Sequence, residues 1–296
     1  MKKIAVIGAG KWGSALAYAF SQKNEVLITS RTPRELDNFV SLQEALACEY
    51  IIITVPAQQI SLWLQKNFKF TGQKILVASK GIEAKTGRFL NEIYSEYIPK
   101  ENIAFLSGPS FAAEVIQSLP TALVVNSVNL ELANEFASMF PEFIKGYASD
   151  DVIGAEVAGA YKNVIAIAAG ICEGLELGKN AAAALTSRGL VEMERFGKSY
   201  GAKTESFFGL SGAGDLFLTA SSTMSRNFRV GLGIAAGKSQ EDILQELGEV
   251  AEGIGTAYAL YEIAQKNDLY LPIAKEVYEM LEGKNPRASL KDLLSK

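Results

Sequence analysis

Hydrophobic positions change their pattern about half-way along the chain. Up to about residue 148, short apolar runs alternate with stretches whose apolar residues recur at helical spacing. The runs predict seven strands, at residues 3–8, 25–29, 50–55, 74–79, 103–107, 122–126 and 143–148. Several are apolar throughout, which is typical of parallel strands covered on both faces. Helical patterns lie between them, at residues 12–22, 57–68 and 88–98. This alternation predicts a doubly wound, mainly parallel sheet.

The second half of the chain shows no strand pattern. Its apolar spacing predicts helices at residues 150–175 and 180–200, a pair around 214–237, and three more between 241 and 296. Residues 199–215 are rich in glycine and serine, so we expect loops there. The predicted fold class is therefore α/β, with a sheet domain at residues 1–148 and an all-helical domain at residues 149–296.

Composition excludes several classes of function. The 296 residues carry a formal net charge of −4, so no basic surplus is available to neutralise nucleic-acid phosphates. The chain contains no histidine, which rules out a Ser-His-Asp device and histidine-ligated metals. Acid–base chemistry must therefore use Lys, Asp, Glu, Tyr or Cys. We expect no metal site and no nucleic-acid partner.

The two cysteines and the longest apolar run bear on the cellular compartment and on whether the chain spans a membrane. Cys48 and Cys172 form no disulfide framework and no zinc spacing, so we expect buried free thiols in a reducing cytoplasm. The apolar run at residues 164–172 is far shorter than the roughly 20 residues that span a bilayer. We therefore expect no membrane span.

The sequence GAGKWG at residues 8–13 is a GxGxxG motif that follows one strand and opens a helix. In that context it predicts a Rossmann-type dinucleotide site. Gly8 allows the tight turn, Gly10 the approach of a pyrophosphate, and Gly13 the packing of helix on strand. The helix N-terminus offers free N–H groups to the phosphates. A purely structural turn is the alternative.

The end of the second strand carries information about the cofactor. An NAD-selective site usually places an acid about 20 residues after the glycines. Here Ser30 and Arg31 stand in that region, and an arginine accepts a 2′-phosphate. We expect NADP or NAD to bind, with NADPH preferred. A solvated loop arginine is the alternative interpretation.

Several segments together resemble the bacterial NAD(P)-dependent glycerol-3-phosphate dehydrogenases. They are GAGKWG (8–13), SKGIE (79–83), LSGPSFAAEV (106–115), YKNVIAIAAG (161–170), LSGAGDLFLTASSTMSRNFRVG (210–231) and VAEGIGT (250–256). The resemblance covers essentially the whole chain in the right order. Lys11, Ala113 and Ala213 depart from the family's usual residues, and Lys11 is the departure that bears on cofactor contacts.

Lys162 matches the family's catalytic lysine. Apolar neighbours such as Val164 and Ile165 are expected to bury it and so to lower its pKa, as a general base near neutral pH requires. An ionised Asp215 nearby would raise that pKa, and the sequence leaves this competition open. A lysine that snorkels to solvent is the alternative.

Other residues complete the catalytic set that the resemblance implies. Lys80 ends the fourth strand, where it would contact substrate and cofactor; a lysine before a glycine turn is the alternative. Asp215 and Thr219 are four residues apart, so a helix puts them on one face. An ordinary helix-capping pair would show the same spacing.

The resemblance also implies binding contacts. For the substrate and its phosphate they are Gly108, Ser110, Ser225, Arg226 and Asn227, together with Lys80, Lys162 and Asp215. For the cofactor they are Gly8, Gly10, Lys11, Trp12, Gly13, Arg31, Lys80, Ala112, Arg226, Val250 and Glu252. Glu252 reads equally well as an acid that caps a helix.

The resemblance predicts an oxidoreductase that interconverts dihydroxyacetone phosphate and sn-glycerol 3-phosphate and supplies glycerophospholipid synthesis. It also implies a homodimer. A 6-phosphogluconate-type or ketopantoate-type reductase shares the plan and is the first rival. A non-catalytic NADP(H) sensor is the second, and cofactor binding without turnover would support it.

Overall fold

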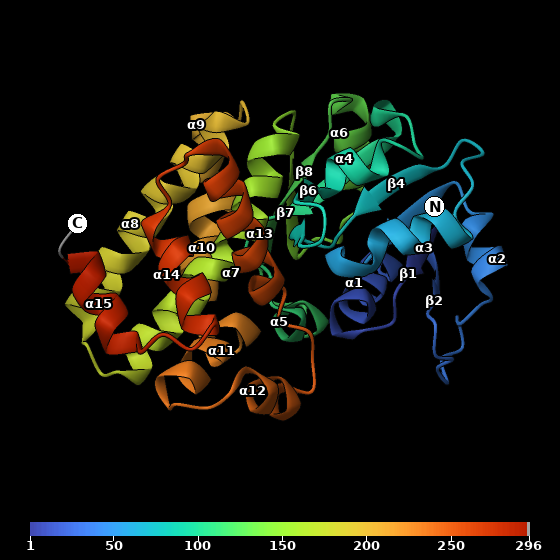
Figure 1. Cartoon of the computed structure of the whole chain (residues 1–296). Helices are drawn as coiled ribbons and strands as arrows, with labels where there is room; N and C mark the ends of the chain where they lie inside the picture. The colour runs from blue at the N-terminus through green and yellow to red at the C-terminus, as the bar shows by residue number, and fades with distance from the viewer. Residues whose placement is uncertain (295–296) are drawn as a thin grey trace.

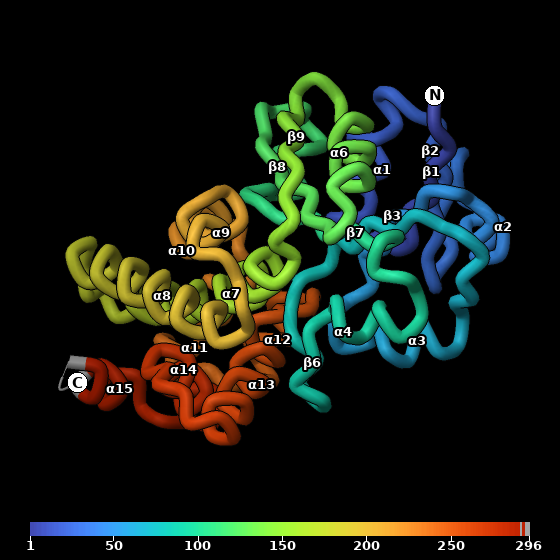
Figure 2. Tube along the Cα trace, turned by 90° about the horizontal axis from the view of Figure 1, so that it is seen from above, coloured from blue at the N-terminus to red at the C-terminus, as the bar shows by residue number. Residues whose placement is uncertain are grey.

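The chain folds into two parts, a sheet with helices on both faces and a bundle of helices beside it (Figure 1). The computed structural model describes residues 1–294. Seen from above, the helical part extends away from the sheet, with α8 (Lys179–Ser199) and α15 (Pro286–Leu294) at its far side (Figure 2). The predicted fold class, a Rossmann-type sheet followed by helices, is confirmed.

The seven predicted strands form one sheet. Its order is β2-β1-β3-β4-β7-β8-β9. All neighbouring pairs are parallel except β7 with β8. The strands are β1 (Lys3–Ile7), β2 (Glu25–Thr29), β3 (Tyr50–Ile53), β4 (Lys74–Val77), β7 (Ile103–Ser107), β8 (Thr121–Asn126) and β9 (Ile144–Ser149).

Alternate residues of the inner strands enter two separate cores. In β1, Ile4 and Val6 face one core while Ala5 and Ile7 face the other. The first core packs under α1 (Lys11–Ser21), α5 (Ala112–Ile116) and α6 (Leu130–Ser138). The second packs under α2 (Leu42–Leu46), α3 (Ile60–Asn67) and α4 (Leu90–Tyr94). Because both faces are covered, the inner strands are largely apolar, whereas the edge strand β9 carries Lys145 and Ser149.

A small hairpin after β4 was not predicted from the sequence. It pairs β5 (Ile82–Glu83) with β6 (Arg88–Phe89) in antiparallel fashion. Strands of two residues are too short to produce a readable alternation. Single 3₁₀ turns, η1 (Ala57–Gln59) and η2 (Lys100–Asn102), also fall among the predicted helices and loops.

The helical part is built around α7 (Val152–Gly174). This helix is long and apolar enough to cross a membrane, but 94% of its most apolar window is buried inside the protein. Packed against it are α8, α10 (Asp215–Ala220), α11 (Arg226–Ala235), α13 (Glu252–Asn267) and α14 (Pro272–Leu281). Farther out, α12 (Gln240–Leu247) packs against α11 and α15 packs against α14. Cys172 of α7 and Cys48 after α2 are buried and free, as predicted.

Two sequence predictions for this part were wrong. Residues 199–215 contain α9 (Thr204–Phe208) and a π-helical turn, η3 (Leu210–Gly214), instead of loops alone. Close packing explains Gly212, since a Cβ there would lie 2.2 Å from the carbonyl oxygen of Phe207, whereas Gly201 is needed for its φ of +84°. Four helices rather than three follow residue 239, because short links after Leu247, Asn267 and Leu281 divide them. The last predicted helix ran to residue 296, and its final two residues lie outside the described residues.

Candidate active site

The glycine turn joins β1 to α1 at the carboxyl edge of the sheet. Gly8 has a φ of +115°, and a Cβ there would lie 2.2 Å from Thr54 Oγ1. A Cβ at Gly13 would lie 1.8 Å from the carbonyl oxygen of Gly8. By contrast, a Cβ at Gly10 would meet no atom within 4 Å. Packing therefore requires Gly8 and Gly13, whereas Gly10 borders open space.

The surroundings of this turn suit a dinucleotide. Gly10 caps α1 without a side-chain hydrogen bond, and the first turn holds no acidic residue. The N–H groups of that turn are therefore available to an anion. Ser79 Oγ, at the end of β4, is buried and has no hydrogen-bond partner within residues 1–294. These features fit a nicotinamide dinucleotide with its pyrophosphate against α1.

The remaining predicted cofactor residues of the sheet domain lie around the same turn. Trp12 donates from Nε1 to the carbonyl oxygen of Ala78 at 3.0 Å, which ties α1 to the end of β4. Ala112 begins α5, a helix that packs against α1. Arg31 is exposed, two residues beyond the end of β2. Since Gly8 N donates to Thr29 O at 2.8 Å, this end of β2 adjoins the glycine turn.

Lys162 lies inside the protein, on the side of α7 that faces α10. Its side chain is only 10% exposed. Its Nζ donates to the carboxylate of Asp215 and to Thr219 Oγ1, the latter at 3.0 Å. These three side chains therefore lie together, and Lys162 does not snorkel to solvent.

The sequence left open whether burial or Asp215 has the larger influence on the pKa of Lys162, and in the structure burial has the larger influence. Burial lowers the pKa of Lys162 to about 8, although the Asp215 carboxylate acts in the opposite direction and Lys80 adds to the lowering. Burial alone would raise the pKa of Asp215, but the two lysines hold it below its ordinary value. The site therefore contains a lysine that gains and loses its proton near neutral pH beside a fixed carboxylate.

Asp215 is held in place from several sides. Thr219 Oγ1 donates to the Asp215 carbonyl oxygen at 2.6 Å, one helical turn away. The π-helical turn η3 leads directly into Asp215, and such turns occur often at functional sites. Ser211 of η3 shares a 2.7 Å hydrogen bond with Ser107 at the end of β7. This bond anchors the turn to the sheet.

Lys80 brings the sheet domain to the same carboxylate. Its Nζ donates to Asp215 Oδ2 at 2.6 Å and to the carbonyl oxygen of Gly108 at 3.4 Å. Its aliphatic stem passes close to Gly159 of α7, where a Cβ would lie 3.2 Å from Lys80 Cδ. Ser110 Oγ donates back to Gly108 O at 3.3 Å. Lys80, Gly108 and Ser110 are therefore one cluster at the sheet's edge.

The predicted phosphate-binding trio begins α11, and its members differ in how free they are. Ser225 is buried and caps the helix by accepting from Phe228 N at 3.2 Å. Asn227 is also buried; its amide donates to Asn163 Oδ1 and accepts from Gly253 N, both at 2.9 Å. The Arg226 side chain is 41% exposed. Arg226 is therefore the member most available to a ligand.

The start of α13 lies near the cations of the candidate site. Glu252 is half-buried at the first position of the helix. Burial raises its carboxyl pKa, against the influence of Arg226 and Lys80. Val250, just before it, is exposed. Glu252 is thus within electrostatic reach of these cations and is also the acid in the first turn of α13, so both interpretations stay open.

Sequence reasoning missed several residues that shape the site. Asn163, beside Lys162, fixes Asn227, and Ser107 with Ser211 supports Asp215. Ser79 and Glu249 also border the site. Adjacent motif residues were the only sequence signal for them, because serine and asparagine take such supporting roles in many unrelated places.

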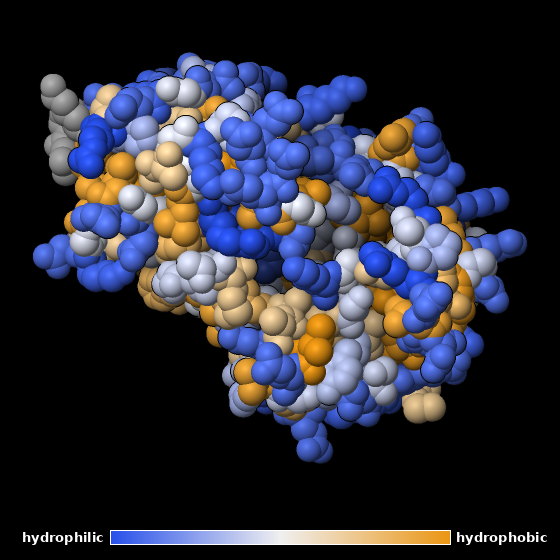
Figure 3. Space-filling model, turned by 90° about the horizontal axis from the view of Figure 1, so that it is seen from below, coloured by the Kyte–Doolittle hydropathy of each residue, from blue (hydrophilic) through white to orange (hydrophobic). Residues whose placement is uncertain are grey.

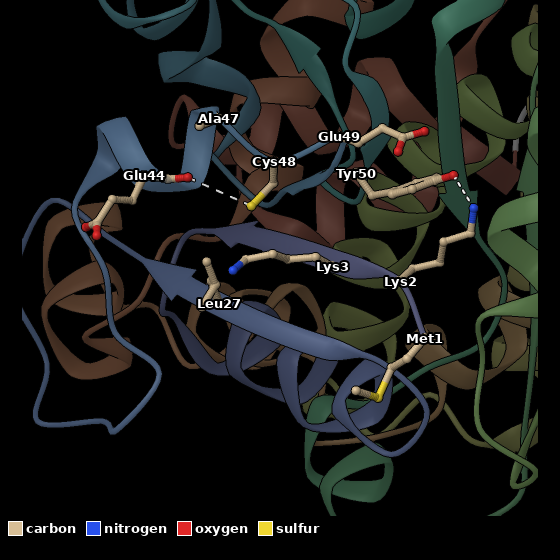
Figure 4. A pocket seen from close by; sticks show the side chains of 9 residues that line it. All are labelled: Met1, Lys2, Lys3, Leu27, Glu44, Ala47, Cys48, Glu49 and Tyr50. Carbon is tan, nitrogen blue, oxygen red and sulfur yellow. Dashed lines mark hydrogen bonds between the residues drawn. The ribbon is translucent and has the colours of Figure 1, made fainter.

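One well-formed cavity lies elsewhere. It measures about 500 Å³ and opens at the amino ends of β1 and β3 (Figure 4). Its lining residues are Met1, Lys2, Lys3, Leu27, Glu44, Ala47, Cys48, Glu49 and Tyr50. Ligands of open α/β sheets bind at the carboxyl ends of the strands, so this cavity is not the candidate site.

Comparison with known families decides the identity of the fold. The family model described as NAD-dependent glycerol-3-phosphate dehydrogenase C-terminus matches residues 151–291. The corresponding N-terminus model matches residues 3–40 and 22–133. The chain belongs to the NAD-dependent glycerol-3-phosphate dehydrogenase family. Membership confirms the predicted enzyme class, an oxidoreductase, and the predicted use of NAD or NADP.

Individual relatives agree with this family. The chain is 72% identical over 295 residues to a glycerol-3-phosphate dehydrogenase [NAD(P)+] of Sulfurimonas denitrificans, covering 100% of both chains. It is 60% identical to one from Nitratiruptor, covering 99% of this chain and 98% of that protein. The crystal structure of glycerol-3-phosphate dehydrogenase from Coxiella burnetii is 31% identical, with a TM-score of 0.91, and covers 100% and 99% of the two chains.

The ketopantoate-type reductases, the alternative enzyme class considered above, are similar to this chain in fold alone. A putative 2-dehydropantoate 2-reductase of Enterococcus faecalis has a TM-score of 0.57 at 14% identity, over 97% of this chain and 99% of that one. The glycerol-3-phosphate dehydrogenase family thus accounts for the chain better than the ketopantoate-type reading does.

Proposed function

We propose that this protein reduces dihydroxyacetone phosphate to sn-glycerol 3-phosphate, with Lys162 as the general acid and with NADPH preferred over NADH. The observation that carries the proposal is the buried Lys162, whose pKa is about 8, on a carboxylate that Lys80 also contacts. No other described lysine combines such burial with a pKa lowered toward neutrality.

The residues divide the work of the reaction. Arg226, with Ser225 and Asn227 at the start of α11, holds the substrate phosphate, since guanidinium groups bind phosphate oxygens in a bidentate manner. Gly108 and Ser110 border the bound substrate. Lys80 polarises the C2 carbonyl oxygen. Asp215 and Thr219 orient Lys162 by the hydrogen bonds described above.

Proton and hydride move to adjacent atoms of the substrate. When bound, the reduced nicotinamide supplies a hydride to C2. Lys162 donates a proton to the C2 oxygen, which becomes the hydroxyl, and the neutral amine then takes a proton from water. In the opposite direction the neutral amine removes the hydroxyl proton. Positive charge on Lys80 and Lys162 stabilises the developing alkoxide, so the residues present can carry the step without a metal ion.

The cofactor contacts follow the same division. Gly8, Gly10, Lys11, Trp12 and Gly13 form the pyrophosphate cradle. Arg31 would pair with a 2′-phosphate, which supports the preference for NADPH. Ala112, Val250 and Glu252 would border the remainder of the cofactor. We propose residues 1–148 as the cofactor domain and residues 149–296 as the substrate domain.

The cellular setting is part of the proposal. The product is the backbone of glycerophospholipids, so we infer a role in their synthesis in the cytoplasm. We also infer a homodimer, which light scattering of the purified protein would test. A monomer at micromolar concentration would remove that inference and leave the proposed reaction untouched.

The reaction is tested by following NADPH and NADH oxidation with dihydroxyacetone phosphate, with dihydroxyacetone as the matched control. We expect turnover with the phosphorylated substrate alone and a higher kcat/KM with NADPH. Arg226→Ala should mainly raise the substrate KM. Cofactor binding without turnover on either ketone would instead support the sensor.

A further inference from the structure

One carboxylate connects the cofactor turn to the phosphate-binding helix. Glu249 lies in the short link between α12 and α13, between Gly248 and Val250. Its Oε1 is 2.5 Å from Lys11 Nζ, and its Oε2 is 3.6 Å from Arg226 Nη1. In Figure 1 this link runs up beside α5, between the helical part and the sheet.

A third cation, on α11, acts on the same carboxylate through its charge. Arg229 lies one turn after Arg226 in α11, and its positive charge also lowers the pKa of Glu249. The Nε of Arg229 is buried and has no hydrogen-bond partner within the described chain. The hydrogen bond from Lys11 is the largest cause of that lowering, so Glu249 is ionised at neutral pH. Two cations, one from each part of the protein, therefore pair with one carboxylate, and the charge of Arg229 adds to their effect.

The two cations that Glu249 pairs with are positioned for ligands. Lys11 is the first residue of α1, beside the open space at Gly10. Arg226 is the first residue of α11. Both helices direct free N–H groups toward this region, and both positions attract phosphate oxygens. Seen from below, hydrophilic side chains surround a hollow between the two domains (Figure 3).

We propose that Glu249 is an internal stand-in for ligand phosphate: its carboxylate occupies Lys11 and Arg226 until the cofactor and the substrate displace it. This inference rests on the proposed function, which assigns a phosphate-bearing ligand to each cation. Glu249 is a positioning residue, because it touches neither reacting atom. Before either ligand binds, Glu249 forms ion pairs with a cation of each binding site.

The shared carboxylate couples the two ligands. A ligand phosphate at either cation repels Glu249 and favours its withdrawal from both. The second ligand then meets a cation that is already free, so it binds more tightly than it would alone. By linkage, the factor is the same whichever ligand binds first.

The test compares Glu249→Gln with the matched control Glu246→Gln. Glu246 lies in α12, is exposed, and pairs with Lys238 away from the site. Dissociation constants for NADPH and for glycerol 3-phosphate are measured by fluorescence and calorimetry, each alone and with the other present. The two ligands do not react together because both are in the reduced state.

In Glu249→Gln, each ligand alone should bind roughly twofold to fivefold more tightly, the change that one partly exposed ion pair supports. In the wild type, the affinity for each ligand should increase by some factor when the other is bound. In Glu249→Gln that factor should fall toward one. Glu249→Asp, which keeps the charge, should retain part of the enhancement. Glu246→Gln should behave as the wild type.

Unchanged or weaker binding in Glu249→Gln, or enhancement that persists there, would overturn the proposal. Glu249 would then be a simple interdomain strut or a direct ligand contact. This failure is distinguishable from a failure of the proposed function, because wild-type turnover of dihydroxyacetone phosphate is measured independently. If that turnover is absent, the NADPH constants alone still decide whether Glu249 competes for Lys11.

Discussion

At the scale of single residues, the pKa of Lys162 depends on the opposing influences of burial and of the neighbouring charges. The Lys162 ammonium contacts a carboxylate, which favours the charged form, yet burial is the larger influence and its pKa falls to about 8. The residue types and their spacing could be predicted from the sequence. The sign of the net shift could not, because it depends on the distance to Asp215 and on how completely α7 and α10 exclude water.

The pH dependence of kcat/KM tests this balance. The protonated fraction of Lys162 falls as the pH rises through about 8, so we expect reduction of dihydroxyacetone phosphate to decline above that pH. Oxidation of glycerol 3-phosphate needs the neutral amine, so it should rise up to the same pH and then level off. Parallel profiles in both directions would contradict the assignment.

Removal of the amine gives a second test at this scale. Lys162→Ala should lower kcat by roughly 10²–10⁴-fold, the usual contribution of a general acid or base. NADPH affinity should remain nearly unchanged. The exposed Lys179, which pairs with Glu173, provides the control variant Lys179→Ala. Near-normal turnover in Lys162→Ala would remove its catalytic role.

At the scale of elements, the strand pattern was predictable and the short-range packing was not. The inner strands were predicted because they are nearly continuous apolar runs, whereas the edge strand β9 (IKGYAS) gives a weaker signal of the same kind. The π-helical turn η3 and the β5–β6 hairpin were missed, since neither produces a period that the sequence displays. For the three glycines in GAGKWG, the motif predicted a turn at Gly8, ligand approach at Gly10 and packing at Gly13, and the space around each agrees with that division.

Two substitutions in that turn separate these roles. Gly13→Ala places a methyl group against the Gly8 carbonyl, so it should lower stability by about 1–3 kcal/mol or more. Gly10→Ala meets open space and should leave the Tm nearly unchanged. It should nevertheless weaken NADPH binding roughly tenfold, about 1.4 kcal/mol. Thermal melts and fluorescence titrations measure both; equal losses of stability would contradict this distinction.

At the scale of the whole molecule, polar contacts join the two parts across the site. They are Lys80 with Asp215, Ser107 with Ser211, and Lys11 with Glu249. Val152, at the start of α7, is also buried in a core of the sheet domain. We therefore expect the two parts to unfold together in one calorimetric transition. NADPH at about 100 times its dissociation constant should stabilise the protein by about 2.7 kcal/mol. Two separate transitions, with NADPH shifting only one, would contradict this coupling.

The sequence by itself determined the fold class, the cofactor turn and the residue types of the site, because periodicity and glycine chemistry act locally. It also brought Asp215 and Thr219 together, since four residues make about one helical turn. Only the tertiary structure decided that Lys80 and Lys162 share Asp215, that Asn227 supports Asn163, and that Glu249 joins Lys11 to Arg226. These contacts link residues far apart in the chain, so they depend on how α7, α11 and α13 pack beside the sheet.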